Sequence, residues 1–120
     1  MSMSKTPWGL VALAVLLPMA AAQAQSFPTR PVRMIVGFPP GGSSDVSARL
    51  VAEKMAEEWK QPVLVENKVG AGGTIAAAAV AAAPADGYTL LHVGPGTHAI
   101  TSVLYKDLPY DALKSFAGVG

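Results

Sequence analysis

The amino-acid sequence predicts an α/β fold in which a mostly parallel sheet is flanked by helices. Three short apolar runs each end in a glycine-rich turn, and each turn leads into a stretch with helical character. Strands that alternate with helices in this way are typical of βα units. The chain contains no cysteine, so disulfides and thiolate chemistry are excluded and an apolar core must hold the fold.

The first predicted strand covers residues 32–38, Val-Arg-Met-Ile-Val-Gly-Phe, which are mostly apolar and rich in β-branched side chains. This composition favours a strand that is buried on both faces. Residues 39–42, Pro-Pro-Gly-Gly, end the strand, because proline removes ladder donors and glycine permits left-handed backbone angles. We expect Ser43 or Ser44 to cap the following helix and Asp45 to lie in its first turn.

That helix is predicted to run to about Trp59. An apolar stripe with helical spacing predicts the face that packs on the sheet, and it consists of Ala48, Val51, Ala52, Met55, Ala56 and Trp59. Arg49, Glu53 and Glu57 lie off the stripe, so we expect them to face water.

The second unit repeats this plan. Residues 63–67 have the composition of a strand, residues 70–73 form a glycine-rich turn, and Thr74 begins an alanine-rich helix that continues to about Ala83. Residues 84–87, Pro-Ala-Asp-Gly, end that helix.

A third strand is predicted over residues 88–93, followed by the turn 94–96 and a helix start at 97–98. In a parallel sheet the three turns lie at the carboxyl ends of their strands, along one edge. Open α/β sheets bind ligands at this edge.

The first 24 residues have the features of an export signal. Lys5 supplies a positive charge, residues 8–20 are apolar, and Ala22-Gln23-Ala24 fits an A-x-A cleavage site. A membrane anchor is the alternative, but the apolar stretch is shorter than the ~20 residues that a spanning helix needs. We therefore expect cleavage after Ala24, no stable membrane insertion afterwards, and a mature chain that begins at Gln25.

Loss of Lys5 would leave eight basic and eight acidic residues, interspersed along the chain. A neutral chain without a basic stripe does not favour a nucleic-acid partner.

The glycine turns can be interpreted in two ways. Glycines let a ligand approach the backbone, and free N–H groups at a helix start favour an anion. A plain strand-to-helix turn uses the same residues, so the first turn alone leaves both interpretations open. The second turn lacks the spacing of a nucleotide-binding loop. In the third, His98 could donate to a ligand oxygen or simply begin a helix.

Signs of catalysis are weak. The sequence has no G-x-S-x-G elbow and no helical H-E-x-x-H. His92 lies inside a predicted strand, where packing or a backbone contact is the more usual role. Two separated histidines without carboxylate spacing predict no metal site, and we expect no cofactor and no enzyme activity.

The order of motifs resembles the opening of tripartite tricarboxylate transporter receptors, the Bug proteins. The resemblance is carried by Arg30-Pro31-Val32-Arg33-Met34-Ile35-Val36-Gly37-Phe38-Pro39-Pro40-Gly41-Gly42, then Asp45, Val65-Glu66-Asn67, Gly70-Ala71-Gly72-Gly73, Asp86-Gly87-Tyr88-Thr89-Leu90-Leu91 and Leu108-Pro109-Tyr110-Asp111. It covers nearly all of residues 25–120. Gly37, where proline is commoner, and Lys68-Val69, in place of Arg-Pro, are mild departures.

The resemblance implies a periplasmic-binding-protein-like (type II) fold of two α/β domains with a ligand cleft. It also implies a monomeric periplasmic receptor that delivers a small organic acid to membrane permease subunits. The ligand-binding positions that it implies here are Phe38, Pro40, Gly41, Gly42, Ser43, Asp45, Gly72, Gly73, Thr74, Gly96, Thr97 and His98.

We expect residues 25–120 to be the N-terminal part of the first ligand-binding domain. On this view the domain is truncated, and its return strands and the second domain are absent. Two other functions stay open: an exported α/β enzyme domain that uses the glycine loops for an oxyanion, and a binding protein that serves as a sensor input.

Overall fold

The computed structural model describes residues 26–94 and 96–119. Its elements are the strands β1 (Val32–Val36), β2 (Val63–Asn67) and β3 (Thr89–His92), and the helices α1 (Ser43–Trp59), α2 (Thr74–Ala81) and α3 (Thr101–Leu104). A short 3₁₀ turn, η1 (Ala71–Gly73), precedes α2, and a π-helical turn, η2 (Gly96–Ile100), precedes α3. The predicted export signal, residues 1–24, lies outside the described residues.

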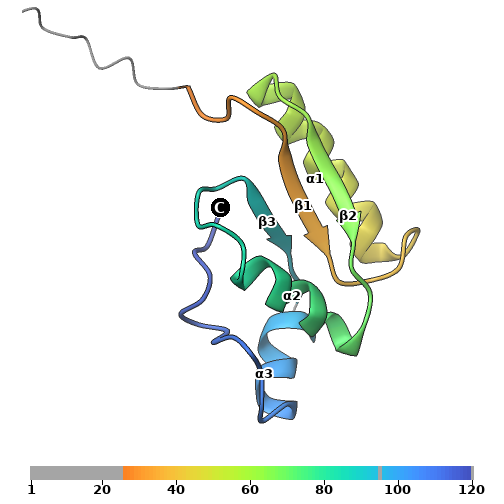
Figure 1. Cartoon of the computed structure of the whole chain (residues 1–120). Helices are drawn as coiled ribbons and strands as arrows, with labels where there is room; N and C mark the ends of the chain where they lie inside the picture. Colours follow the sequence, from red (N-terminus) through yellow and green to blue (C-terminus); the bar gives the residue numbers. More distant parts are fainter. Residues whose placement is uncertain (1–25, 95, 120) are drawn as a thin grey trace, which may run out of the picture.

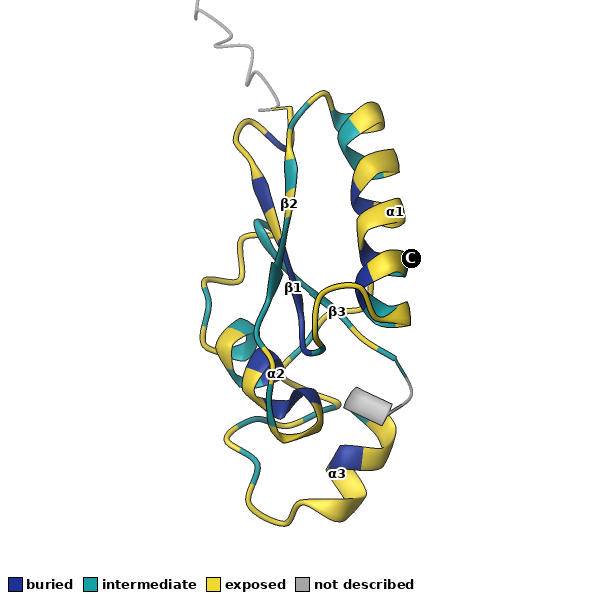
Figure 2. Ribbon diagram, turned by 90° about the vertical axis from the view of Figure 1, so that its right-hand side faces the viewer, coloured by how far each residue is buried: buried dark blue, intermediate teal, exposed yellow. Residues whose placement is uncertain are grey.

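The three strands form a parallel sheet in the order β2-β1-β3. Figure 1 shows the strands side by side, and Figure 2 shows α1 on one side of the sheet and α2 on the other. β1 lies in the centre, which explains why Val32, Met34, Ile35 and Val36 are all buried. The predicted α/β fold with a parallel sheet is therefore confirmed.

The core lies mainly between the sheet and α1. Met34 and Val36 pack against Ala48 and Ala52, and the partly buried residues around them are Phe38, Met55, Val63, Val65 and Leu90. The small alanines let α1 lie close to the sheet. On the other face Ile35 is buried, and α2, which contacts β1, has Ala76 and Ala77 buried.

The predicted elements are mostly present in the structure, but some of them end earlier than predicted. β1 stops at Val36 where the prediction continued to Phe38, and α2 stops at Ala81 where it continued to Ala83. The stripe on α1 was wrong at one position, because Val51 is 46% exposed. Asp45, Ala48 and Ala52 are the buried positions of the helix.

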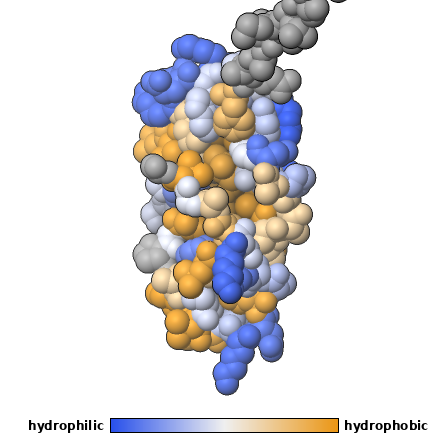
Figure 3. Space-filling model, turned by 90° about the vertical axis from the view of Figure 1, so that its left-hand side faces the viewer, coloured by the Kyte–Doolittle hydropathy of each residue, from blue (hydrophilic) through white to orange (hydrophobic). Residues whose placement is uncertain are grey.

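Apolar surface is widespread on the side of the molecule that Figure 3 shows. Large apolar side chains exposed after β3 include Val93, Ile100, Val103, Leu104 and Leu113. Within residues 26–94 and 96–119, no helix has the length and apolar character to cross a membrane.

Candidate functional site

The carboxyl ends of the three strands lie in one row. Val36 pairs with Asn67 on one side and with His92 on the other, and these are the last residues of their strands. The loops that follow β1 and β2 therefore leave the sheet at the same edge, as does the chain after β3 (Figure 1). The sequence predicted this arrangement.

The first loop, residues 37–42, delivers the chain to the N-terminus of α1. Gly41 has a φ of 85°, which favours glycine, and Gly42 is the N-cap in an extended conformation without a side-chain cap. The predicted cap at Ser43 or Ser44 was therefore wrong: the chain turns into the helix one residue earlier, so both serines already lie in its first turn. Pro39, Pro40, Gly41, Gly42 and Ser43 are all exposed.

The first turn of α1 presents backbone donors at this edge. The first intrahelical hydrogen bond runs from the Val46 N–H to the Gly42 carbonyl oxygen. Among the described residues, no acceptor is found for the N–H groups of Ser43 and Ser44. Such unpaired donors, together with the helix dipole, give a helix N-terminus an affinity for anions.

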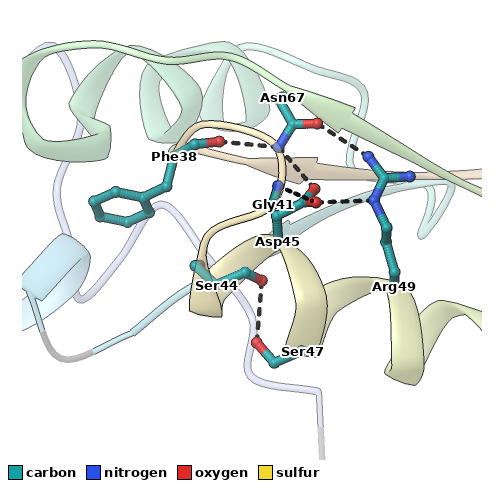
Figure 4. A network of polar contacts seen from close by, with 7 residues as sticks. All are labelled: Phe38, Gly41, Ser44, Asp45, Ser47, Arg49 and Asn67. Carbon is teal, nitrogen blue, oxygen red and sulfur yellow. Dashed lines mark hydrogen bonds and ion pairs between the residues drawn. The ribbon is translucent and has the colours of Figure 1, made fainter.

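Asp45 ties the first loop to its surroundings (Figure 4). Its carboxylate accepts hydrogen bonds from the Gly41 N–H at 2.9 Å, from Arg49 Nε at 3.0 Å and from Asn67 Nδ2 at 2.9 Å. The residue is buried, so these donors replace the water that a carboxylate would otherwise hold. Asp45 therefore lies inside the loop's own network.

The same contacts hold the pKa of Asp45 well below its ordinary value. The largest cause is the hydrogen bond from Arg49, followed by those from the Gly41 N–H and from Asn67. All three favour the charged form. Asp45 thus stays ionised beside the helix N-terminus, and the Arg49 guanidinium offsets its charge.

The second loop lies against the first. Gly70, Gly72 and Gly73 have φ values of 142°, 64° and 92°, and Gly73 is buried. Thr74, predicted as a ligand contact, is buried with its hydroxyl donating to the Ala71 carbonyl oxygen at 2.9 Å. Its hydroxyl is therefore already engaged within the loop, and Gly72 remains the exposed glycine of this turn.

The residues of the third predicted turn, Gly96, Thr97 and His98, have different surroundings. Gly96 and Thr97 lie in η2, whose contacts with η1 bring it beside the second loop. The His98 ring packs edge-on against Phe116, with 5.3 Å between the ring centroids, and Phe116 also contacts Tyr110. His98 Nδ1 and the Tyr110 hydroxyl are buried without a partner among the described residues. His98 is thus held by the C-terminal segment.

Four polar residues near the edge were not predicted as site residues. Asn67 and Arg49 complete the Asp45 network, with Arg49 Nη2 donating to Asn67 Oδ1 at 3.2 Å. Ser47 Oγ lies 3.0 Å from His92 Nε2. The i, i+4 spacing of Asp45 and Arg49 was the available sequence signal.

Two surface hollows are found in the described part of the chain, and neither is lined by residues 37–43. One, of about 400 Å³, lies between α1 and β2, and its lining includes Ala52, Ala56 and Leu64. The other, of about 730 Å³, lies beside α3, and its lining includes the predicted site residue His98 together with Tyr105 and Lys106. In the described part of the chain no group of three His, Asp or Glu side chains could hold a metal ion.

Solved structures similar to this chain define its class. A periplasmic transporter aligns with a TM-score of 0.71 and 49% identity, over 73% of this chain and 30% of that one. MatC from Rhodopseudomonas palustris with bound malate aligns at 0.70 and 46% identity, over 75% and 31%. A second R. palustris protein, with adipate, aligns at 0.68 and 42% identity, over 72% and 29%. The fold is that of a periplasmic binding protein.

Residues 47–120 match the tripartite tricarboxylate transporter family receptor, so the chain belongs to this family. A UPF0065 protein of Bordetella bronchiseptica is 50% identical over 109 residues, covering 91% of this chain and 32% of that protein. Protein BugT of Bordetella pertussis is 44% identical over 101 residues, covering 83% and 31%. The chain spans about a third of the length of these relatives. The predicted resemblance is confirmed.

Proposed function

We propose that this chain supplies one side of the ligand site of a periplasmic receptor for a small organic carboxylate. The receptor would pass its ligand to a membrane transporter. The family membership and the malate and adipate bound by two structural relatives support this proposal. On this proposal residues 1–24 are a cleaved export signal, and residues 25–120 are the first part of a ligand-binding domain.

The observation that carries the proposal is the first turn of α1. The Ser43 and Ser44 N–H groups lie at the carboxyl edge of the sheet, at the end of an exposed glycine loop. We assign the carboxylate contact to residues 38–43, which are this loop from Phe38 onward and the first residue of α1, with Asp45 as the loop's internal anchor. The backbone at Gly72, Gly96 and Thr97 would line the ligand site. Gly73, Thr74 and His98 would pack behind these residues.

Backbone donors explain a preference for carboxylates without fixing which one binds. Two N–H groups and a helix dipole recognise the charge and shape of a carboxylate, which malate and adipate share. The choice between acids would rest on side chains that meet the rest of the ligand.

One serine–histidine contact is found among the described residues, and its arrangement does not favour an enzymatic role. Ser47 Oγ also lies 3.0 Å from the Ser44 carbonyl oxygen, and we assign its one hydrogen to that oxygen and not to His92. A serine nucleophile needs the opposite arrangement, in which the histidine accepts that hydrogen. Receptors of this family bind their substrates without converting them, and we propose the same here.

The sharpest test removes a single N–H group. Proline is well tolerated at the first position of a helix, and the extended backbone of Gly42 suits a following proline. We expect Ser43→Pro in the complete gene product to weaken malate or adipate binding by ~1.5–3 kcal/mol, the contribution of a hydrogen bond to a charged group. Ser43→Ala keeps the N–H group and should bind like the wild type.

Calorimetry with adipate and its neutral diamide, adipamide, tests the charge requirement. Adipate or malate should bind and adipamide should not. Equal binding by S43P, S43A and wild type would refute the assignment of the first loop. N-terminal sequencing of the periplasmic protein tests the signal, with Gln25 expected first.

A further inference from the structure

Asn67 joins the two ends of the first loop. Its Nδ2 donates to the Phe38 carbonyl oxygen, at the start of the loop, and to Asp45 Oδ1, just beyond its end, both at 2.9 Å. Its Oδ1 accepts from Arg49 Nη2 at 3.2 Å. Because one side of the Asn67 amide faces two acceptors and the other faces a cation, its nitrogen must lie toward Phe38 and Asp45 and its oxygen toward Arg49. All three contacts are drawn in Figure 4.

We propose that Asn67 is a positioning residue that holds the first loop, and with it the N-terminus of α1, in the conformation that receives a carboxylate. This inference rests on the proposed function. Asn67 itself would not touch the ligand, and it would act through Phe38 and Asp45.

The loop needs such a support because it holds itself weakly. Its internal contact, from the Gly42 N–H to the Pro39 carbonyl oxygen, is long at 3.4 Å. Gly41 and Gly42 also have wide conformational freedom in the unbound chain. The short contacts instead run to Asp45 and Asn67.

The position of Asn67 in the fold suits this role. It is the last residue of β2 and pairs in register with Val36, the last residue of β1. Asn67 is therefore fixed to the sheet by the strand ladder, and its side chain reaches the loop from a rigid neighbour. A loop anchored in this way presents its donors already oriented, so that less ordering is needed when a ligand binds.

The test uses Asn67→Asp and Asn67→Ala in the complete gene product, with malate and adipate as probes. N67D places a second carboxylate against Asp45. The new carboxylate would also face Arg49, which already pairs with Asp45, so at pH 8 one guanidinium would have to offset two negative charges. At pH 5 a proton shared between the two carboxylates can restore one donor. We expect N67D to bind at least tenfold more weakly than wild type at pH 8 and to recover part of this loss at pH 5. N67A should lose affinity by a similar factor at both pH values.

Glu66→Gln is the matched control. Glu66 is the neighbouring residue on β2, but it pairs with Arg33, at 2.6 Å and 2.7 Å. Neither contact reaches the loop, so E66Q should bind within about twofold of wild type at both pH values.

Amide exchange of the Gly41 N–H provides a readout without ligand. This group donates to Asp45 Oδ2, so its exchange should quicken at least tenfold in N67A and stay unchanged in E66Q. If N67D does not fold at pH 8, Asn67→Ser, which adds no charge, replaces it in the exchange measurement with the expectation given for N67A.

Wild-type affinity and wild-type Gly41 exchange in N67A would overturn the inference, as would an N67D loss that is equal at pH 5 and pH 8. A wild-type protein that binds neither acid would overturn the proposed function instead. In that case Gly41 exchange would still decide whether Asn67 holds the loop.

Discussion

Gly37, directly after β1, touches the backbone of Gly73, directly before α2. A Cβ placed on Gly37 would lie 2.7 Å from the Gly73 Cα and 3.3 Å from the Gly73 carbonyl oxygen. The first and second glycine loops are thus in direct backbone contact at the edge of the sheet. This contact lets the two loops form a continuous rim.

Gly37→Ala should therefore destabilise the protein. The added methyl group meets backbone atoms, which cannot move aside as a flexible side chain can, and overpacking of this kind costs about 1–3 kcal/mol. Denaturant unfolding of the complete gene product measures the change. Gly94→Ala is the control, because a Cβ there would meet nothing within 4 Å, and it should stay within about 0.5 kcal/mol of wild type. Equal stability of the two variants would contradict the close contact.

Acid should weaken the protein through Asp45. The pKa of Asp45 is lowered in the folded state, mainly by the hydrogen bond from Arg49. A lowered pKa gives stability that is fully present above the unfolded value, about 3.9, and is lost as the pH falls through the folded value. Asp45→Asn should therefore be less stable than wild type at pH 7, and the gap should narrow below about pH 4.

Urea midpoints measured from pH 7 to pH 3 test this dependence. Glu57→Gln serves as the control, since Glu57 forms an exposed i, i+3 pair with Lys54 that adds little. Its difference from wild type should be small throughout. A D45N difference that stayed constant down to pH 3 would show that the ionisation of Asp45 does not stabilise the fold.

The Ser47–His92 contact predicts a histidine tautomer. Ser47 Oγ lies 3.0 Å from both the Ser44 carbonyl oxygen and His92 Nε2, and we assign its one hydrogen to the carbonyl oxygen, which leaves Oγ to accept from His92 Nε2–H. Nitrogen chemical shifts of the neutral ring should therefore show the proton on Nε2. Ser47→Ala removes the acceptor and should cost about 1 kcal/mol. Ser102→Ala, whose hydroxyl donates to the Ala99 carbonyl oxygen at an exposed position, should cost less. A proton on Nδ1 would contradict the assigned contact.

The sequence predicted the elements well wherever local chemistry defines them. Residues 63–67 were predicted as a strand and form β2, which lies between Pro62 and the glycine-rich turn that begins at Gly70. The end of α1 at Trp59 also agrees, since Lys60 takes a left-handed conformation and Pro62 follows. The common edge of the three turns followed from the parallel order of the strands.

The contacts within the candidate site could not be predicted in the same way. Asn67 is 22 residues from Asp45 and 29 from Phe38, and only the β1–β2 register brings them together. His98 was predicted as a ligand contact from its place after a glycine turn, and nothing in the sequence indicated that its ring packs on Phe116, which belongs to a segment with no regular pattern. Local sequence defines a turn, whereas the partners of its side chains depend on tertiary packing.

An aromatic cluster holds the opposite, amino end of the sheet. The Phe27 ring lies edge-on to Trp59 at the end of α1, at 5.8 Å, and to Tyr88 before β3, at 5.0 Å. It therefore links the segment before β1 to both elements, and Phe27→Ala should reduce stability. Because Phe27 is 51% exposed, we expect a loss of about 1–2 kcal/mol, smaller than that for a core phenylalanine.

Leu113→Ala, 89% exposed, is the control and should change stability by less than about 0.5 kcal/mol. Thermal unfolding measures both, and ligand affinity should be unchanged in F27A, because the cluster lies at the far end of the strands from the first loop. A weakened affinity together with unchanged stability would mean that the amino end of the sheet influences the binding edge.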